Sequence, residues 1–237
     1  MDIKVISTAR DCELLDLKGK TVVVIDVLRS SSVIITALAN GASAVVPYVK
    51  ASELLDVYSS GDKEHMLRCG ERNTRKIVDF DLGNSPSEYT SDVVEGKRIL
   101  LTSTNGTLAL KNCSSANKVL VAGFVNISAV VDYIMLEGRN LVIVCAGTNN
   151  RFSLEDGLLA GMMIQMIRER CQVFLDDMGN LLSKFSIDDS DQLLSRIIEC
   201  SHAKKLVSEG FHDDVISCLQ IDTFDIVPVY IEGKITK

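Results

Sequence analysis

Four short segments of this 237-residue chain pass directly from apolar residues into acids, arginines and hydroxyl groups. They are residues 26–32 (DVLRSSS), 70–75 (GERNTR), 102–106 (TSTNG) and 145–151 (CAGTNNR). Guanidinium groups and the backbone N–H groups at helix starts bind phosphate and sulfate, whereas carboxylates repel such anions. Acids and arginines together therefore predict a site where Mg²⁺ lies between the carboxylates and an anionic ester.

The charged side chains of these segments, and of the helix that follows the last one, are the first candidates for this chemistry. The candidate acids are Asp26, Glu71, Glu155 and Asp156, and the candidate arginines are Arg29, Arg72, Arg75 and Arg151. Structural roles stay open. Asp26 and the serines at 30–32 are also suitable residues for the start of the helix at 30–40. Glu155 and Asp156 lie in the first turn of the helix at 154–170, where the helix dipole favours acids. The coincidence of four polar segments favours the functional interpretation.

Cys145 and Arg151 allow a second kind of catalysis. Their C-x5-R spacing, between an apolar strand and a helix, is that of cysteine-dependent phosphatases, in which a helix N-terminus and an arginine activate the thiol. The alternative for Cys145 is an ordinary core thiol at the end of LVIVC. Other phosphate motifs are absent from the sequence: there is no P-loop and no G-x-G-x-x-G, and Leu28 stands where an aspartyl-phosphate enzyme has its second acid.

Alternating strands and helices would position these residues. Apolar, β-branched runs predict strands at 21–25, 44–48, 66–69, 98–102, 118–122, 141–145 and 226–231. Periodicity and end signals predict helices at 30–40, 51–59, 85–94, 107–111, 127–137 and 154–170, followed by a helical C-terminal part. Ser85, Pro86 and Glu88 give the clearest helix start, and Pro228 suggests that the last strand lies at an edge. The pattern predicts one α/β domain over residues 1–237, with a mainly parallel or mixed sheet covered on both faces. The carboxyl ends of its strands would bring the four polar segments together.

Composition excludes several classes of protein. The net charge of −7, the lack of a Lys/Arg block and the lack of Trp argue against nucleic acid and anionic lipid as partners. Mean hydropathy is +0.19, yet no run of about 20 apolar residues is present, so we expect no membrane segment. Seven cysteines without a C-x-x-C pair indicate a reducing cytoplasm. The histidines, His65, His202 and His212, show no ligand spacing and are interpreted as structural or surface groups.

The polar segments and their flanks resemble one known family. VVVIDVLRSSSVIITALANGA, GERNTRKIVDFDLGNSPSEY, LTSTNGTLAL and CAGTNNRFSLEDGLLAG are similar to blocks of the 2-phosphosulfolactate phosphatases of coenzyme M biosynthesis. The resemblance implies a three-layer α/β/α fold, a homodimer, and Mg²⁺-dependent hydrolysis of 2-phospho-3-sulfolactate to 3-sulfolactate and phosphate. It also implies a set of site residues in this chain: Asp26, Arg29, Glu71, Arg72, Asn84, Ser85, Thr102, Thr104, Asn105, Gly106, Thr148, Glu155 and Asp156.

The resulting hypothesis is metal-assisted hydrolysis of a small anionic organic phosphate. Asp26, with Glu71, Glu155 or Asp156, would hold Mg²⁺. Arg29 and the backbone amides of Ser30, Ser31 and Ser32 would stabilise the phosphoryl oxygens, and Arg75 would add positive charge. Arg72, Thr104 and Asn105 would bind the sulfonate and the carboxylate. Two alternatives remain: a cysteine phosphatase that uses Cys145 and Arg151, and a domain that binds an organic phosphate without hydrolysing it.

Overall fold

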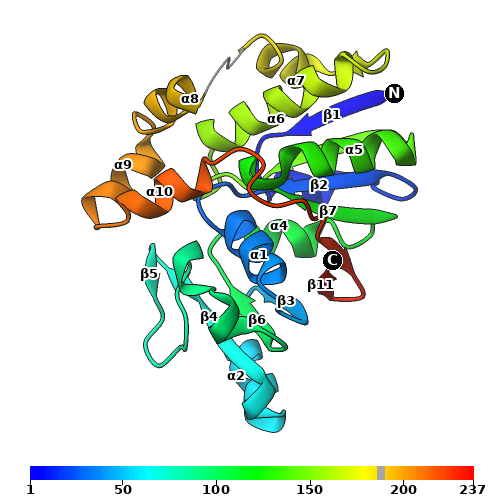
Figure 1. Cartoon of the computed structure of the whole chain (residues 1–237). Coiled ribbons are helices and arrows are strands. Elements are labelled where there is room, and N and C mark those ends of the chain that lie inside the picture. The colour runs from blue at the N-terminus through cyan, green and yellow to red at the C-terminus, as the bar shows by residue number, and fades with distance from the viewer. Residues whose placement is uncertain (186–189) are drawn as a thin grey trace.

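A computed structural model describes residues 1–185 and 190–237, and eleven strands of this described chain form one sheet (Figure 1). In chain order the strands are β1 (Asp2–Ile6), β2 (Thr21–Ile25), β3 (Ala44–Tyr48), β4 (Met66–Arg72), β5 (Arg75–Lys76), β6 (Arg98–Thr102), β7 (Lys118–Ala122), β8 (Leu141–Cys145), β9 (Phe174–Leu175), β10 (Val229–Ile231) and β11 (Lys234–Thr236). Across the sheet the order is β5-β4-β6-β3-β11-β10-β7-β2-β8-β1-β9. Five predicted strands have the expected bounds, β4 ends later and β10 begins later than predicted, and β1, β5, β9 and β11 were not predicted.

The sheet consists of two parallel sets joined by an antiparallel hairpin. β4, β6 and β3 form one set, and β7, β2, β8, β1 and β9 form the other. The hairpin β10–β11 lies between them, where β10 pairs with β7 and β11 pairs with β3. The prediction that the last strand lies at an edge is therefore wrong. Pro228 precedes β10 and uses only its carbonyl, which accepts from Val121 N at 3.0 Å, so its missing N–H costs no ladder bond.

The twist of the sheet explains how both sets reach one site. β2 and β6 are five pairings apart, and three of these pairings are antiparallel, so the two sets would point in opposite directions in a flat sheet. Neighbouring strands are rotated by about 20–25°, so five pairings turn the sheet by roughly 100–125°. The carboxyl ends of β2 and β6 lie close together although the strands belong to different sets, since a Cβ on Gly106, which follows β6, would be 2.6 Å from Oδ2 of Asp26, which follows β2.

Helices cover both faces, which confirms the three-layer α/β/α class. They are α1 (Ser30–Ala39), α2 (Ala51–Ser60), α3 (Ser91–Val94), α4 (Gly106–Asn112), α5 (Ile127–Glu137), α6 (Leu154–Arg168), α7 (Asp177–Leu182), α8 (Ser190–Ile197), α9 (Ser201–Ser208) and α10 (His212–Cys218), with 3₁₀ turns η1 (Asp11–Leu14), η2 (Lys63–His65), η3 (Pro86–Glu88) and η4 (Phe124–Asn126). β2 shows the layering: Val22 and Val24 pack in the core with α1 and α4, while Val23 and Ile25 pack in the core with α5, α6, α9 and α10. Each fully buried Val or Ile contributes about 1.5–3 kcal/mol.

The predicted helix at 85–94 is wrong, because only η3 and the four-residue α3 form there. Ser85 does precede Pro86 as expected, but its hydroxyl does not cap the turn. Ser85 Oγ instead donates to Asp214 at 2.6 Å, and Glu88 accepts from Gly83 N at 2.9 Å. A long-range contact has replaced the local capping box, which leaves the first turn without its side-chain cap.

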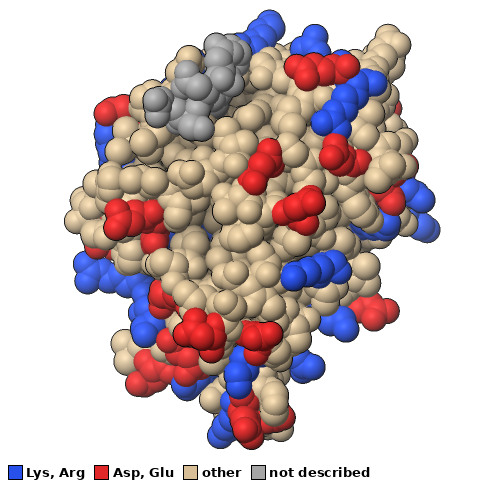
Figure 2. Space-filling view, in the orientation of Figure 1, with Lys and Arg blue, Asp and Glu red and all other residues tan. Residues whose placement is uncertain are grey.

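The described surface agrees with the charge pattern of the sequence. On the face seen in Figure 2, acidic and basic side chains are mixed and form no continuous basic area. Within residues 1–185 and 190–237, no helix has the length and apolar character needed to cross a membrane.

Candidate active site

A cavity of about 780 Å³ lies at the carboxyl ends of β2, β4, β6 and β8. All four polar segments contribute to its wall, so their predicted convergence is confirmed. The predicted residues on the wall are Asp26, Arg29, Ser30, Glu71, Asn84, Thr104, Asn105, Thr148, Glu155 and the alternative candidate Arg151. The turn before α9 and α9 itself close the other side, with Cys200, Ser201, His202, Lys205 and Leu206.

Asp26 directly follows β2 and is held by the first turn of α1. Its Oδ1 accepts from Ser30 N at 3.3 Å, its carbonyl accepts from Ser31 N at 2.9 Å, and its own N–H donates to Ser31 Oγ at 2.9 Å. The predicted role of the Ser30 and Ser31 amides is therefore not what the structure shows, because these amides fix Asp26 instead of facing a ligand. Asp26 Oδ2 makes no hydrogen bond within the described residues and is available for a ligand.

Gly106, the first residue of α4, allows the close approach of Asp26. A Cβ at this position would lie 2.6 Å from Asp26 Oδ2 and 2.7 Å from Ser30 Cβ. We expect Gly106→Ala to displace the Asp26 carboxylate and to lower kcat/KM for phosphate release by about 10–100-fold, while the fold survives. Steady-state kinetics with a thermal unfolding control would test this, and wild-type kinetics would show that Asp26 tolerates the shift.

Burial raises the pKa of Asp26 to about 6 from its ordinary 3.8. The charges of Glu71 and Glu155 raise this pKa further, whereas His202 and the Ser30 N–H oppose the shift. Three acids in one cavity thus disfavour full ionisation unless a cation is present.

The shifted pKa of Asp26 predicts a pH-dependent stability. Below about pH 4 the group is protonated in both folded and unfolded chains, and above about pH 6 its ionised form destabilises the metal-free fold. In EDTA, Asp26→Asn should therefore unfold like the wild type at pH 4 and be more stable by on the order of 3 kcal/mol at pH 8. Urea unfolding at both pH values would test this, and an equal difference at both would contradict it.

Glu155, in the first turn of α6, forms a dyad with His202. Glu155 Oε1 lies 3.0 Å from His202 Nδ1, and Cys200 Sγ donates to Oε2 at 3.2 Å. Thr148 Oγ1 is a further 3.2 Å contact of His202 Nδ1. Burial opposes ionisation of Glu155, but the hydrogen bond and charge of His202 prevail and hold the pKa of Glu155 below its usual value. Because a carboxylate only accepts, Nδ1 carries the proton of this contact.

His202 is the functional candidate that sequence reasoning missed. It was interpreted as a structural or surface group, since no ligand spacing surrounds it. The structure places it on the cavity wall with a side chain 14% exposed, and its Nε2 makes no hydrogen bond within the described residues. Only the packing of α9 against the sheet brings it to Glu155, 47 residues earlier in the chain.

Glu71 joins two of the polar segments. Its Oε1 accepts from Thr104 N at 2.7 Å and from Thr104 Oγ1 at 2.8 Å, and its Oε2 accepts from Thr74 N at 2.9 Å. Glu71 therefore places Thr104 and its own carboxylate at the same part of the wall, as the site hypothesis requires.

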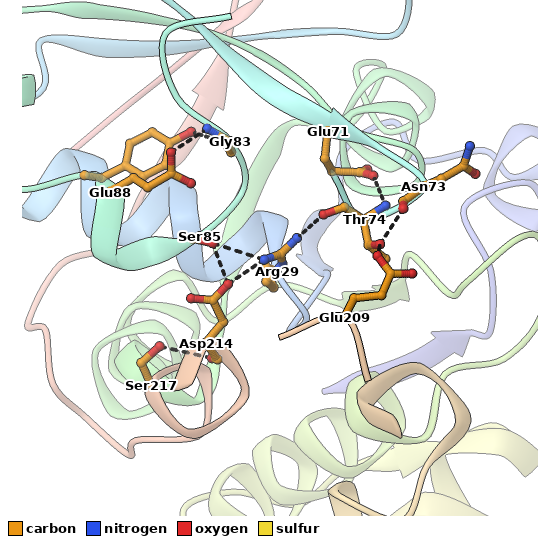
Figure 3. A network of polar contacts seen from close by, with 11 residues as sticks. Arg29, Glu71, Asn73, Thr74, Gly83, Ser85, Glu88, Glu209, Asp214 and Ser217 are labelled. Atoms are coloured by element: carbon orange, nitrogen blue, oxygen red, sulfur yellow. Dashed lines mark hydrogen bonds and ion pairs between the residues drawn. The ribbon is translucent and has the colours of Figure 1, made fainter. Parts of the chain in front are cut away.

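Arg29 lies on the cavity wall, but its guanidinium donates hydrogen bonds to other groups of the protein. Nη1 donates to Asp214 and to Ser85 Oγ at 3.2 Å, and Nη2 donates to the Thr74 carbonyl at 2.7 Å (Figure 3). The Phe211 ring lies 4.2 Å from the guanidinium carbon. Asp214 neutralises the charge of Arg29, so the predicted contact with phosphoryl oxygens would need this network to open.

Several other predicted residues lie outside the cavity wall: Ser31, Arg72, Arg75, Ser85, Thr102, Gly106 and Asp156. Arg72 uses its guanidinium on the carbonyls of Glu71 and Val49 and on Thr102 Oγ1. Arg75 is 77% exposed and pairs with Glu209. Neither guanidinium lies on the cavity wall, since that of Arg72 donates to three protein acceptors and that of Arg75 faces solvent, so their substrate contacts stay predictions.

Asp156 is a structural brace and not an exposed metal ligand. It is buried, with Oδ1 accepting from Val27 N at 2.9 Å and Oδ2 accepting from Gly147 N at 3.1 Å. It thereby ties the segment after β2 to the segment after β8. Burial and the neighbouring acids raise the pKa of Asp156, and the two N–H donors oppose that shift.

The cysteine-nucleophile hypothesis is contradicted. Cys145 is fully buried in the core beneath α6 and does not reach the cavity wall. Burial, with the charges of Asp156 and Glu155, raises the pKa of the Cys145 thiol well above its usual range. A thiol that is buried away from the cavity and disfavoured from ionising is not placed to act as a nucleophile, so the structure gives the C-x5-R spacing no catalytic role.

The donor atoms of the cavity fit a hard cation that is shared with substrate and water. Within residues 1–185 and 190–237, no three His, Cys, Asp or Glu side chains form a metal-binding group by themselves. Asn84 Oδ1 is buried on the wall and has no hydrogen-bond partner there, and Asp26 Oδ2 is available as well. Mg²⁺ commonly takes one or two carboxylates and completes its shell with water and phosphate oxygens, which suits this oxygen set.

Comparison with known proteins identifies the family. The family model described as 2-phosphosulpholactate phosphatase matches residues 7–233. Proteins named "Probable 2-phosphosulfolactate phosphatase" are similar along most of the chain: the one from Thermotoga petrophila is 43% identical over 90% of both chains, and the one from Caldanaerobacter subterraneus subsp. tengcongensis is 42% identical over 90% of this chain and 88% of its own. A relative of the same name from Clostridium novyi is 35% identical over the full length of both. The chain therefore belongs to the 2-phosphosulfolactate phosphatase family of phosphoric monoester hydrolases.

Proposed function

We propose that this protein hydrolyses 2-phospho-3-sulfolactate to 3-sulfolactate and phosphate, with Mg²⁺ as cofactor. The observation that supports this most is the meeting of Asp26, Glu71 and the Glu155–His202 pair in one cavity, within a chain of the named family. Our proposal includes a place in coenzyme M biosynthesis, a cytoplasmic location and a homodimer, as the family resemblance implies.

Asp26, together with Glu71 or Glu155, would hold the metal ion, and the Asn84 carbonyl oxygen would complete the protein's share of the ligands. Bound Mg²⁺ would supply charge neutralisation at the phosphoryl oxygens and an acidified water as nucleophile. Thr104 and Asn105, on the part of the wall that also carries Glu71, would orient the ester. The oxygen of water would bond to phosphorus as that water releases one proton to solvent, the bond from phosphorus to the C2 oxygen would break, and the C2 oxygen would take up one proton.

His202 is the group we assign to this last proton. Its Nδ1 is held by Glu155, which leaves Nε2 toward the cavity as the donor for the departing oxygen. We expect His202→Gln to lower kcat about 100-fold with a small effect on KM. His212→Gln is the matched control, since His212 is half exposed and contacts only its neighbour Asp213 in the described chain. Equal kinetics of the two variants would remove His202 from the mechanism.

A phosphate-release screen tests the proposed activity directly. The purified chain is offered 2-phospho-3-sulfolactate, 2-phospholactate and phenyl phosphate, each with Mg²⁺ and with EDTA. We expect the highest kcat/KM for 2-phospho-3-sulfolactate and loss of turnover in EDTA. Stabilisation by the esters without phosphate release across a panel of divalent metals would instead support a non-catalytic binding domain.

A further inference from the structure

The cavity has a buried acidic floor and an exposed cationic rim. Asp26, Glu71 and Glu155 are at most 7% exposed, whereas Arg151 and Lys205 are exposed side chains at the opening. The other two cationic groups of the wall have acidic partners, because Arg29 pairs with Asp214 and His202 pairs with Glu155. Neither rim cation makes a direct ion pair with an acid in the described residues, and the acid whose charge interacts with that of Lys205 is Glu209, so both can still bind an anionic ligand.

The backbone holds Arg151 in place before any ligand arrives. Thr148 N donates to the Arg151 carbonyl at 2.9 Å, and Arg151 N donates back to the Thr148 carbonyl at 3.1 Å. Asn149 and Asn150, between them, have φ of 53° and 57°, values that Asn adopts more readily than most residues. The turn is anchored to the segment after β6, since Asn149 N donates to Asn105 Oδ1 at 3.2 Å. Arg151 is therefore presented by a closed, braced turn.

Gly147 is required for the same turn. Its φ is +70°, and a Cβ on this residue would lie 2.4 Å from the Arg151 carbonyl oxygen. A glycine at 147 thus permits the close packing that positions Arg151. The Gly147 N–H also donates to Asp156, which fixes the position of the turn. This amount of support for one exposed arginine goes beyond what a solvated surface charge needs.

Lys205 reaches the rim from a different element. It lies three residues after His202 in α9, a spacing that puts both side chains on one face of the helix. His202 belongs to the floor and Lys205 to the opening. The helix α9 therefore supplies both the proposed proton donor, His202, and one cation of the rim, Lys205. Two elements far apart in sequence therefore supply one cation each to the same opening.

We propose that Arg151 and Lys205 bind the sulfonate and carboxylate of the substrate, and thereby select esters that carry anionic groups besides the phosphate. This inference rests on the proposed function. A phosphate directed to the metal and acids of the floor leaves the rest of a three-carbon ester at the rim, where its further charges meet these two cations. Arg72, predicted from sequence for this role, donates to three protein acceptors and lies outside the cavity wall.

Substrate comparison tests the two residues. For Arg151→Ala and Lys205→Ala, kcat/KM for 2-phospho-3-sulfolactate should fall about 10–100-fold, as expected for the loss of a charged hydrogen bond. The fall should be at least about ten times larger than the fall for phenyl phosphate, which has no second anionic group. Arg151→Lys and Lys205→Arg should restore part of the preference. Lys111→Ala is the control, because Lys111 is an exposed cation at the far end of α4 and lies outside the cavity.

A binding measurement separates this inference from the proposed activity. Calorimetry with 3-sulfolactate should show weaker binding to both alanine variants than to the wild type and Lys111→Ala. If the wild type releases no phosphate but the variants still lose 3-sulfolactate affinity, the proposed function fails and the rim assignment stands. If the wild type is an active phosphatase and each variant loses activity equally on all three esters, or loses none, the rim assignment is overturned and the activity stands.

Discussion

Asp26→Asn is expected to abolish most phosphatase activity, with kcat/KM reduced on the order of 10³-fold. Among the buried acids of the cavity wall, Asp26 is the one with a carboxylate oxygen, Oδ2, that accepts no hydrogen bond from a described residue, while its Oδ1 is fixed by Ser30 N. The substitution keeps size and shape but removes the negative charge that would attract Mg²⁺. Activity should also stop rising with Mg²⁺ concentration, which a metal titration of the initial rate would measure.

Glu199→Gln is the matched control for Asp26→Asn. Glu199 lines the same cavity, but its side chain is 72% exposed and pairs with Lys204. Both changes replace one carboxylate by an amide, so a general effect of cavity charge would appear in both variants. We expect Glu199→Gln to stay within about threefold of the wild type, as usual for exposed charges. Wild-type, Mg²⁺-dependent kinetics in Asp26→Asn would remove this residue from the mechanism.

Asp214→Asn is expected to cause the largest loss of stability. The side chains of Arg29 and Asp214 are 2% and 8% exposed, and their ion pair joins the start of α1 to α10. Removing one charge leaves the other buried without compensation, which costs about 3–5 kcal/mol. For a chain of this size, this corresponds to a fall in Tm of roughly 6–20 °C. Urea unfolding at pH 7.5 would measure the free energy of unfolding.

The neighbouring Asp213 is the control for Asp214, because its side chain is fully exposed and contacts only His212 in the described chain. Asp213→Asn should change stability by less than about 0.5 kcal/mol. Arg29→Met combined with Asp214→Leu should recover part of the loss, since both buried charges are then removed together. An Asp214→Asn protein as stable as Asp213→Asn would show that Arg29 does not depend on Asp214.

The Arg29 network also shows how the helical C-terminal part takes part in the site. Asp214 of α10 holds Arg29, and Glu209, just after α9, accepts from the hydroxyl of Thr74 next to Glu71 (Figure 3). These two contacts hold α9 against the rest of the fold. This position of α9 places His202 and Lys205 at the cavity. Asp214→Asn should therefore also lower activity, through the position of α9.

The layered α/β architecture and the convergence of four polar segments were predictable from the order of the residues alone. β2 is apolar from Val22 to Ile25 because both of its faces are buried, and this local composition is readable without coordinates. Likewise, Gly138 with φ of 60° ends α5 where its position predicted an end. Asp26 and Glu155 were found for the same reason, because each stands at the boundary between a buried run and a polar turn.

Which polar side chains are available to a ligand depends on long-range packing and could not be predicted from the order of the residues. Arg29, Arg72 and Asp156 have the residue types of an active site, yet distant partners use their hydrogen-bonding groups. His202 and Lys205 gain their place from the docking of α9, which no local spacing encodes. Secondary structure follows from periodicity between near neighbours in the chain. Whether a guanidinium or a carboxylate already has protein hydrogen-bond partners depends on atoms many residues away. The same reason explains why Pro228 precedes a central strand and not an edge, since the pairing of β10 is decided by the insertion of the hairpin.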